Sequence, residues 1–304
     1  MIEDTETLRR LQKTQLYLLL EVERICKKHN INYFLIGGTL LGAVRNSGFI
    51  PWDDDIDIGM LRSHYNHFIS VCHSELSDEF FLQTKDTKKY TSVATAKLCL
   101  NQTTQTDSSE KDSCSHGGIY IDILPYDNIT NDLRSKIQYN LCLMLRGIAI
   151  KKYKYTILNT TDSLKKRLGV KICAIVEPFL SESRLSQIMD FVMTKYNSTD
   201  TGYIMCLAGA CYSYNQEVQE KEVISNYTNM IFEGYPFPVP QNYDKFLKTL
   251  YGDDYLTPPP ENKRRRHSIL TVDFGKYYEI DIFLKEKGRE VYGKIPDSCV
   301  YSDE

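Results

Sequence analysis

Hydrophobic residues follow a helical spacing at the start of the chain and then change to short, almost continuous apolar runs. Over residues 7–29 the apolar positions that carry this spacing are Leu8, Leu11, Leu18, Val22 and Ile25. They predict an amphipathic helix that ends near Asn30. Residues 31–36, INYFLI, are rich in aromatic and branched side chains and stop at a Gly-Gly pair, as a strand does. Thr39 is then expected to cap a short helix over residues 40–45.

The first half of the chain goes on alternating between strand and helix patterns, and the middle is mostly helical. Further strands are expected at residues 53–58, 92–100 and 119–124, the last of them ended by Pro125. Further helices are expected over residues 64–77, over most of residues 131–196 with an interruption at Pro178, and over residues 242–251. Between the last two, residues 202–234 are typical of short strands and loops, and residues 237–240 of an extended segment. The pattern therefore predicts an α+β fold with a mixed sheet flanked by helices.

Composition and charge exclude several classes of protein. The formal net charge of -3 over 304 residues argues against a nucleic-acid backbone as the main partner. The N-terminus, MIEDTETLRRLQKTQ, is charged where a secretion signal is apolar, and no run approaches the roughly 18 apolar residues of a membrane span. We therefore expect a cytoplasmic protein with no nucleic-acid partner and no transmembrane segment.

Cysteine usage supports the same compartment. Nine cysteines, an odd number without a secretion signal, predict reduced thiols rather than a disulfide framework. Cys114-x-His116 and Cys206-x4-Cys211 each lack a second pair at zinc-binding spacing, so idle thiols are favoured over a zinc site.

The segment PWDDDIDIGM gathers four carboxylates in an otherwise apolar run. In a strand, Asp53, Asp55 and Asp57 would project to one side, whereas Asp54 would project to the other and is left as a surface residue. Like charges on one face are destabilising unless something neutralises them. Carboxylate oxygens are hard ligands, so the sequence predicts a divalent cation, Mg²⁺ or Mn²⁺, held by Asp55 and Asp57, with Asp53 as a weaker candidate.

Two further features point to the same chemistry. Asp122 lies between Ile121 and Ile123, as expected where a neighbouring strand adds one more ligand or a base to the site. Gly37 and Gly38 let the backbone approach a phosphate, and the helix that follows would direct its N-terminal amides at that anion. A Gly-Gly turn, a helix, an acidic strand and a further strand with a single aspartate, in this order along the chain, meet the requirements of metal-assisted phosphoryl or nucleotidyl transfer.

The segment GGTLLGAVRNSGFIPWDDDIDIGM resembles the signature of the LicD/fukutin family, a branch of the nucleotidyltransferase-fold superfamily. The resemblance continues with Ala96-Lys97, with HGGIYIDILPYD around Asp122 and with YGDDYLTPPPENKRRRH near the C-terminus, and it is thin between about residues 131 and 235. It implies a nucleotidyltransferase-like mixed sheet with a mostly helical insertion and a C-terminal basic loop.

This resemblance also implies an activity. Members transfer a phosphorylated small alcohol, such as phosphocholine, ribitol phosphate or glycerol phosphate, from a CDP-activated donor to a sugar hydroxyl and release CMP. The acceptor would be a glycan or glycolipid precursor of the cell surface, as in lipopolysaccharide or teichoic acid modification. Binding to this acceptor would bring the enzyme to the inner face of the membrane as a peripheral protein.

The same resemblance implies roles for individual residues. Asp55 and Asp57 would hold the metal on the donor diphosphate, and Asp122 would either complete the metal site or accept the proton of the sugar hydroxyl. The residues expected to bind substrate are Gly37, Gly38, Thr39, Arg45, Lys97, Lys263, Arg264 and His267. Arg45 has a structural tether of its loop as the alternative role. Cys99 stands where the family usually has a second basic residue, which puts a cationic contact there in doubt.

Four segments follow from this interpretation. They are an N-terminal helix packed on the core (residues 1–30), a nucleotidyltransferase-like catalytic core (31–130), a helical and substrate-binding region of the same domain (131–270) and a C-terminal extension (271–304). Two alternative functions stay open: a nucleotidyltransferase that releases pyrophosphate, and a noncatalytic binding protein with the same fold. The acidic motif lies too early in the chain for a GT-A glycosyltransferase.

Overall fold

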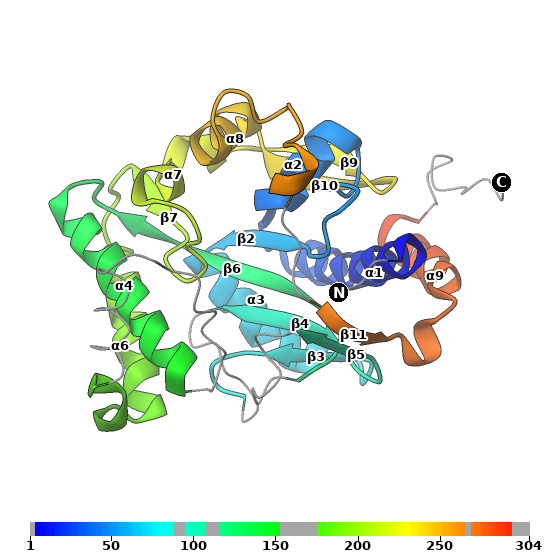
Figure 1. The fold of residues 1–304 in the computed structure, drawn as a ribbon, viewed down its shortest axis with the longest axis horizontal. Coiled ribbons are helices and arrows are strands. Elements are labelled where there is room, and N and C mark those ends of the chain that lie inside the picture. The colour runs from blue at the N-terminus through cyan, green and yellow to red at the C-terminus, as the bar shows by residue number, and fades with distance from the viewer. Residues whose placement is uncertain (1–3, 88–94, 108–115, 153–174, 265–268, 294–304) are drawn as a thin grey trace.

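The computed structural model describes residues 4–87, 95–107, 116–152, 175–264 and 269–293, and all statements below concern these residues. The chain forms a mixed sheet with helices packed around it (Figure 1), which confirms the predicted α+β class. The strands of the main sheet are β1 (Phe34–Leu35), β2 (Asp57–Leu61), β3 (Phe80–Gln83), β4 (Ala96–Leu100), β6 (Tyr120–Ile129), β7 (Tyr203–Met205) and β8 (Gln219–Glu220).

The longest strand, β6, organises this sheet. The order is β1-β2-β6-β4-β3, with β7 and β8 continuing from the distal part of β6. The β2–β6 pair is parallel, and the other pairs are antiparallel. Two small antiparallel sheets join β9 (Tyr227–Phe232) to β10 (Tyr235–Pro240) and β5 (Thr104–Asp107) to β11 (Ile269–Asp273).

Pro125 does not end its strand, contrary to the sequence prediction. β6 changes its antiparallel partner at this point, because β4 pairs with residues up to Ile123 and β7 pairs only from Asp127 onward. The missing N–H of Pro125 therefore falls in the gap between the two ladders.

The helices cover the sheet. They are α1 (Thr5–His29), α2 (Gly37–Asn46), α3 (Arg62–Glu75), α4 (Leu133–Lys152), α6 (Glu182–Thr194), α7 (Tyr214–Glu217), α8 (Tyr243–Tyr251) and α9 (Ile280–Tyr292). Short 3-10 turns add Glu177–Phe179, Lys221–Ile224, Glu261–Lys263 and Gly275–Tyr277, the first of which contains Pro178. α1 and α3 pack against β6 and against each other, while α4 and α6 pair at one end of the molecule.

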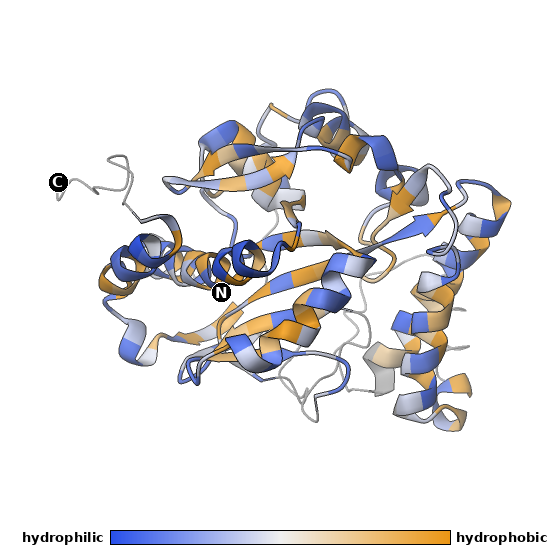
Figure 2. Cartoon of the chain, turned by 180° about the vertical axis from the view of Figure 1, so that it is seen from behind, coloured by the Kyte–Doolittle hydropathy of each residue, from blue (hydrophilic) through white to orange (hydrophobic). Residues whose placement is uncertain are grey.

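The middle of α1 is buried, which follows from its position between the sheet and a second helix. Leu11, Leu16 and Leu20 have no exposed surface, and α1 contacts β4 and β6 on one side and α9 on another. Figure 2 shows that the central strands are mostly hydrophobic, so the sheet and α1 form one core. Residues 269–293, much of the expected C-terminal extension, pack on this core through β11 and α9. The proposed segment boundaries stay predictions.

No helix among the described residues has the length and apolar character that crossing a membrane would require. The cytoplasmic location stays a prediction.

Candidate active site

A cavity of about 840 Å³ opens beside the start of α2, a size suited to a nucleotide-sized ligand. Its walls come from segments far apart in the sequence: the start of α2, the acidic loop (residues 53–56) with Asp57, the segment of residues 206–217, α8, and the basic loop that includes Lys263. The cavity is thus lined by groups of both charges and by aromatic rings.

The acidic loop is not a strand, contrary to the sequence prediction, because β2 begins only at Asp57. Two glutamines of α1 take the carbonyl groups that a strand would offer to a neighbour. Gln12 donates to the Asp53 carbonyl and Gln15 to the Asp54 carbonyl, both at 2.9 Å. The loop is therefore tied to the buried helix α1, and its side chains have a defined position.

Burial nevertheless alternates along this loop as the strand pattern predicted. Ile56 and Ile58 are fully buried, while Asp53, Asp55 and Asp57 are half-buried. Asp54 is the exception: it was expected at the surface and is only 5% exposed. Its low exposure does not place it on the far side of the loop, because Asp54 lines the cavity together with Asp53 and Asp55.

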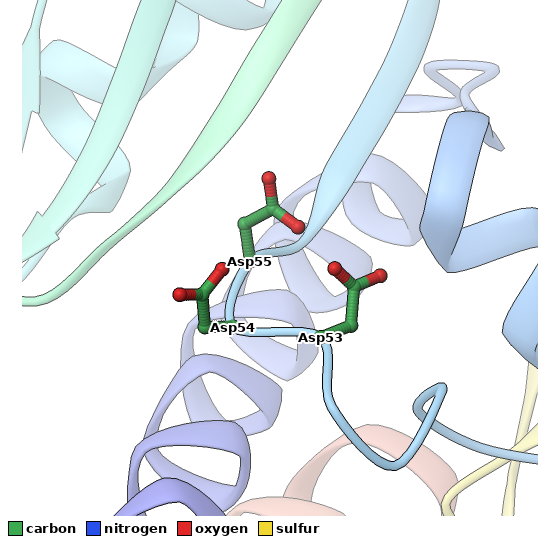
Figure 3. A group of neighbouring side chains, drawn as sticks. All are labelled: Asp53, Asp54 and Asp55. Atoms are coloured by element: carbon green, nitrogen blue, oxygen red, sulfur yellow. The ribbon is translucent and has the colours of Figure 1, made fainter. Parts of the chain in front are cut away.

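Asp53, Asp54 and Asp55 form a group that can hold a metal ion. One carboxylate oxygen from each lies within 4.8 Å of the others. Figure 3 shows the three side chains on the loop that leads into β2, in front of α1. Carboxylates are suitable ligands for a hard divalent cation, so the chemistry of this donor set fits Mg²⁺ or Mn²⁺.

Asp57 and Asp122 lie side by side on the parallel strands β2 and β6. They are partners in the strand register, and Asp122 is also the register partner of Lys97 on β4. Register partners on neighbouring strands point to the same face of a sheet, so these three residues form one row. The Lys97 ammonium lies 3.6 Å from the centre of the Tyr120 ring. Asp57 lines the cavity, whereas Asp122 and Lys97 are not among the described residues that line it.

The N-terminus of α2 faces the carboxylates of Asp53 and Asp57. A Cβ atom built on Gly38 would lie 2.5 Å from an oxygen of Asp53, and one on Gly37 would lie 3.6 Å from an oxygen of Asp57. The helix begins at Gly37, with Ile36 at the N-cap position and no side-chain cap. The first N–H groups of α2 can therefore meet an anion between the helix and the carboxylates.

Thr39 is not the cap of α2, contrary to the sequence prediction. It lies inside the first turn, is buried, and its hydroxyl accepts a hydrogen bond of 2.9 Å from the backbone N–H of Asp57. Thr39 thereby joins α2 to the first residue of β2. Its role in substrate binding stays a prediction, and its structural role is to position Asp57.

Two arginines meet at Trp52 on the rim of the cavity. The guanidinium of Arg264 lies 4.2 Å from the centre of the Trp52 ring, and that of Arg45 lies 5.7 Å from it. Burial lowers the pKa of Arg45, with Asp53 acting in the opposite direction and Arg264 in the same direction. Cations brought together in this way favour an anionic ligand. Lys263 lines the cavity as well, whereas His267 lies outside the described residues.

Sequence reasoning missed the tyrosine-rich wall of the cavity. Tyr212, Glu217 and Tyr251 line it together with Tyr126, which the sequence left unassigned. Glu217 lies on α7, Tyr251 on α8, Tyr126 on β6 and Tyr212 in the loop before α7, and no local motif marks them. The only sequence signal for this wall is the segment YSYNQE, residues 212–217, in which two tyrosines precede a glutamate, and such a pattern is too common to indicate a binding site.

Comparison with known proteins places the chain in a family. The model of the LicD/FKTN/FKRP nucleotidyltransferase domain matches residues 30–141. The lipopolysaccharide cholinephosphotransferase LicD of Haemophilus influenzae is 30% identical over 271 residues, which cover 86% of this chain and 96% of that protein. The ribitol 5-phosphate transferase FKRP of Homo sapiens is 42% identical over 53 residues, which cover 17% of this chain and 10% of that protein. An uncharacterized protein of Rickettsia typhi is 47% identical over 54 residues, 18% of either chain.

The similarity to the Haemophilus protein extends over nearly the whole length of that protein, and the family model includes α2, the acidic loop and Asp122. The chain therefore belongs to the LicD/FKTN/FKRP family and is a LicD-type phosphotransferase.

Proposed function

We propose that this enzyme transfers phosphocholine from CDP-choline to a sugar hydroxyl of a cell-surface glycan precursor and releases CMP. The observation that carries the proposal is the cavity in which the acidic loop, the N-terminus of α2 and the cations of the basic loop converge. Such a combination suits a diphosphate with a divalent cation. The choice of alcohol is supported by the Haemophilus relative, whose name describes a cholinephosphotransferase acting on lipopolysaccharide. Ribitol phosphate and glycerol phosphate are the competing donor groups.

We propose that the aspartates of the acidic loop, with Asp57, hold Mg²⁺ or Mn²⁺. The three carboxylates of the loop fit this ion by their oxygen ligands and by their mutual distances. A bound cation would neutralise the negative charge of the donor diphosphate. Asp53 faces the start of α2, so a cation that it helps to hold would lie near the helix N–H groups and offset the repulsion between the diphosphate and the carboxylates.

Protein groups then orient the two reacting partners. Gly37 and Gly38 allow the diphosphate to approach the backbone, and Arg45 and Lys263 line the same cavity. The sugar hydroxyl attacks the phosphorus that carries choline, the bond to the CMP oxygen breaks, and CMP leaves. Asp122 is the proposed acceptor of the hydroxyl proton, because it is the register partner of Asp57 on the neighbouring strand.

A nucleotidyltransferase reaction is the second candidate, because the matching family model describes a nucleotidyltransferase domain. The two reactions differ in their phosphorus-containing products. Phosphorus NMR of the protein incubated with Mg²⁺, a choline-free glycan acceptor and, separately, CDP-choline, CDP-ribitol, CDP-glycerol or CTP distinguishes them. We expect CMP to appear with CDP-choline and to require the acceptor. Release of pyrophosphate from CTP, without CMP from any CDP-alcohol, would contradict the proposal.

A further inference from the structure

One wall of the cavity combines two aromatic rings with a carboxylate. The rings of Tyr212 and Tyr251 stand at 89° to each other with their centres 5.8 Å apart, so they form a corner. Glu217 lines the same part of the cavity. Aromatic faces next to a negative charge are the usual surroundings of a quaternary ammonium group, which has no N–H to donate.

The Glu217 carboxylate is held in place by the backbone. One of its oxygens accepts hydrogen bonds from the N–H groups of Cys211 at 2.7 Å and of Tyr212 at 2.8 Å. Glu217 therefore also positions the Tyr212 ring, since it fixes the backbone from which that ring projects.

Among the described residues, the cation that acts on Glu217 is Arg146, which does not form a salt bridge with it. Its carboxylate forms no ion pair within 4 Å there, and the nearby guanidinium of Arg146 donates instead to the carbonyl of Ala210 at 2.6 Å. Burial raises the pKa of Glu217, with the two N–H groups and the charge of Arg146 acting in the opposite direction. A partly buried carboxylate in this state gains most from a ligand that brings its own positive charge.

Tyr251 connects this wall to the phosphate end of the cavity. Its hydroxyl would lie 3.9 Å from a Cβ atom built on Gly37, at the start of α2, while its ring contacts Tyr212. Tyr251 therefore contacts Tyr212 on one side and lies beside the start of α2 on the other. The short two-carbon bridge of phosphocholine requires neighbouring sites of this kind for its phosphate and its ammonium group.

We propose that Tyr212, Tyr251 and Glu217 bind the quaternary ammonium group of the donor and select phosphocholine over the phosphates of uncharged polyols. This inference rests on the proposed function, because it takes the diphosphate to lie at the start of α2. Glycerol and ribitol carry no charge and would leave Glu217 without a cationic partner. A desolvated contact between a cation and aromatic rings supports a preference of roughly tenfold to thirtyfold.

Calorimetric titration of the whole protein with CDP-choline, CDP-glycerol and CMP, each with Mg²⁺, tests the inference. The variants are Glu217→Gln, which keeps the shape of the side chain, and Tyr212→Leu, which removes the ring without touching the carboxylate. Glu222→Gln and Tyr278→Leu are matched controls, since both residues are exposed and outside the cavity.

We expect the wild type to bind CDP-choline about tenfold to thirtyfold more tightly than CDP-glycerol. Each test variant should lose this preference and keep its affinity for CMP, while both controls should match the wild type. Equal binding of the two donors by the wild type, or an intact preference in Tyr212→Leu, would overturn the inference and leave the use of a CDP-alcohol standing. A wild type that binds neither donor would overturn the proposed function itself.

Discussion

The contact between Gly38 and Asp53 gives a sharp test of the metal site. A Cβ atom on Gly38 would lie 2.5 Å from Oδ2 of Asp53 and 3.5 Å from its Cγ, and the first distance is shorter than real Cβ contacts allow. The Gly38→Ala variant must therefore displace the Asp53 carboxylate. Gly38 lies in α2 and its φ is outside the left-handed region, so alanine meets no backbone strain there and favours the helix by roughly 0.5–1 kcal/mol.

We expect Gly38→Ala to separate stability from metal binding. Its free energy of unfolding, measured with urea, should equal or slightly exceed that of the wild type, because the gain in helix propensity offsets the shift of one short side chain. Its affinity for Mn²⁺, measured by electron paramagnetic resonance, should fall about tenfold or more, as it does when the surroundings of metal ligands are disturbed.

Gly37→Ala is the matched control, and it should show the opposite pattern. Gly37 has a φ of +54°, and its Cβ would make only an ordinary contact of 3.6 Å with Asp57. The left-handed conformation costs a non-glycine residue roughly 1–2 kcal/mol, so this variant should be less stable while Mn²⁺ binding changes little. Wild-type affinity for Mn²⁺ in Gly38→Ala would refute the place of Asp53 in the metal site.

Three further predictions concern the remaining groups of the cavity. Asp57→Asn should lower the rate of transfer in a CMP-release assay at least about 100-fold, the usual effect of losing one electrostatic contact, while the same change at the exposed Asp78 should leave the rate unchanged. A rate of Asp57→Asn above about a tenth of the wild type would count against a metal-binding role for Asp57. Arg264→Ala should raise the KM for the donor more than Arg265→Ala, because Arg264 stacks on Trp52 at the cavity rim, and equal small effects would indicate a solvated loop. Burial raises the pKa of Glu217 above 4.5, so its ionisation destabilises the fold as the pH rises from the unfolded pKa through the folded one. The free energy of unfolding, measured with urea at several pH values, should therefore fall less in Glu217→Gln than in the wild type over that pH interval. The same pH dependence in both proteins would contradict a raised pKa of Glu217.

The local pattern of the sequence predicted the part of the site that local physics determines. Alternation correctly predicted that Ile56 and Ile58 are buried and that Asp53, Asp55 and Asp57 are not, but it was wrong for Asp54, which is buried beside Asp53 and Asp55. The apolar flanks of Asp122 indicated a buried strand next to Asp57, and the register has them as partners. The chemical roles of these carboxylates stay predictions.

The errors arose where distant segments decide the local structure. β2 starts late because Gln12 and Gln15 of α1 take the carbonyl groups of the acidic loop, and a glutamine pattern in one helix does not reveal its partner. Pro125 is tolerated because of the strands that happen to flank β6. Glu217 and Tyr251 lie in separate helices, 34 positions apart in the sequence, and line one cavity only after folding, so periodicity alone could not connect them.

The most direct test of the central claim is a crystal structure of the protein with Mn²⁺ and CDP-choline, in which anomalous scattering locates the metal. We expect the metal between the donor diphosphate and the carboxylates of the acidic loop and Asp57, with the diphosphate against Gly37 and Gly38. A metal held away from these aspartates, or a donor whose diphosphate lies outside this cavity, would contradict the account.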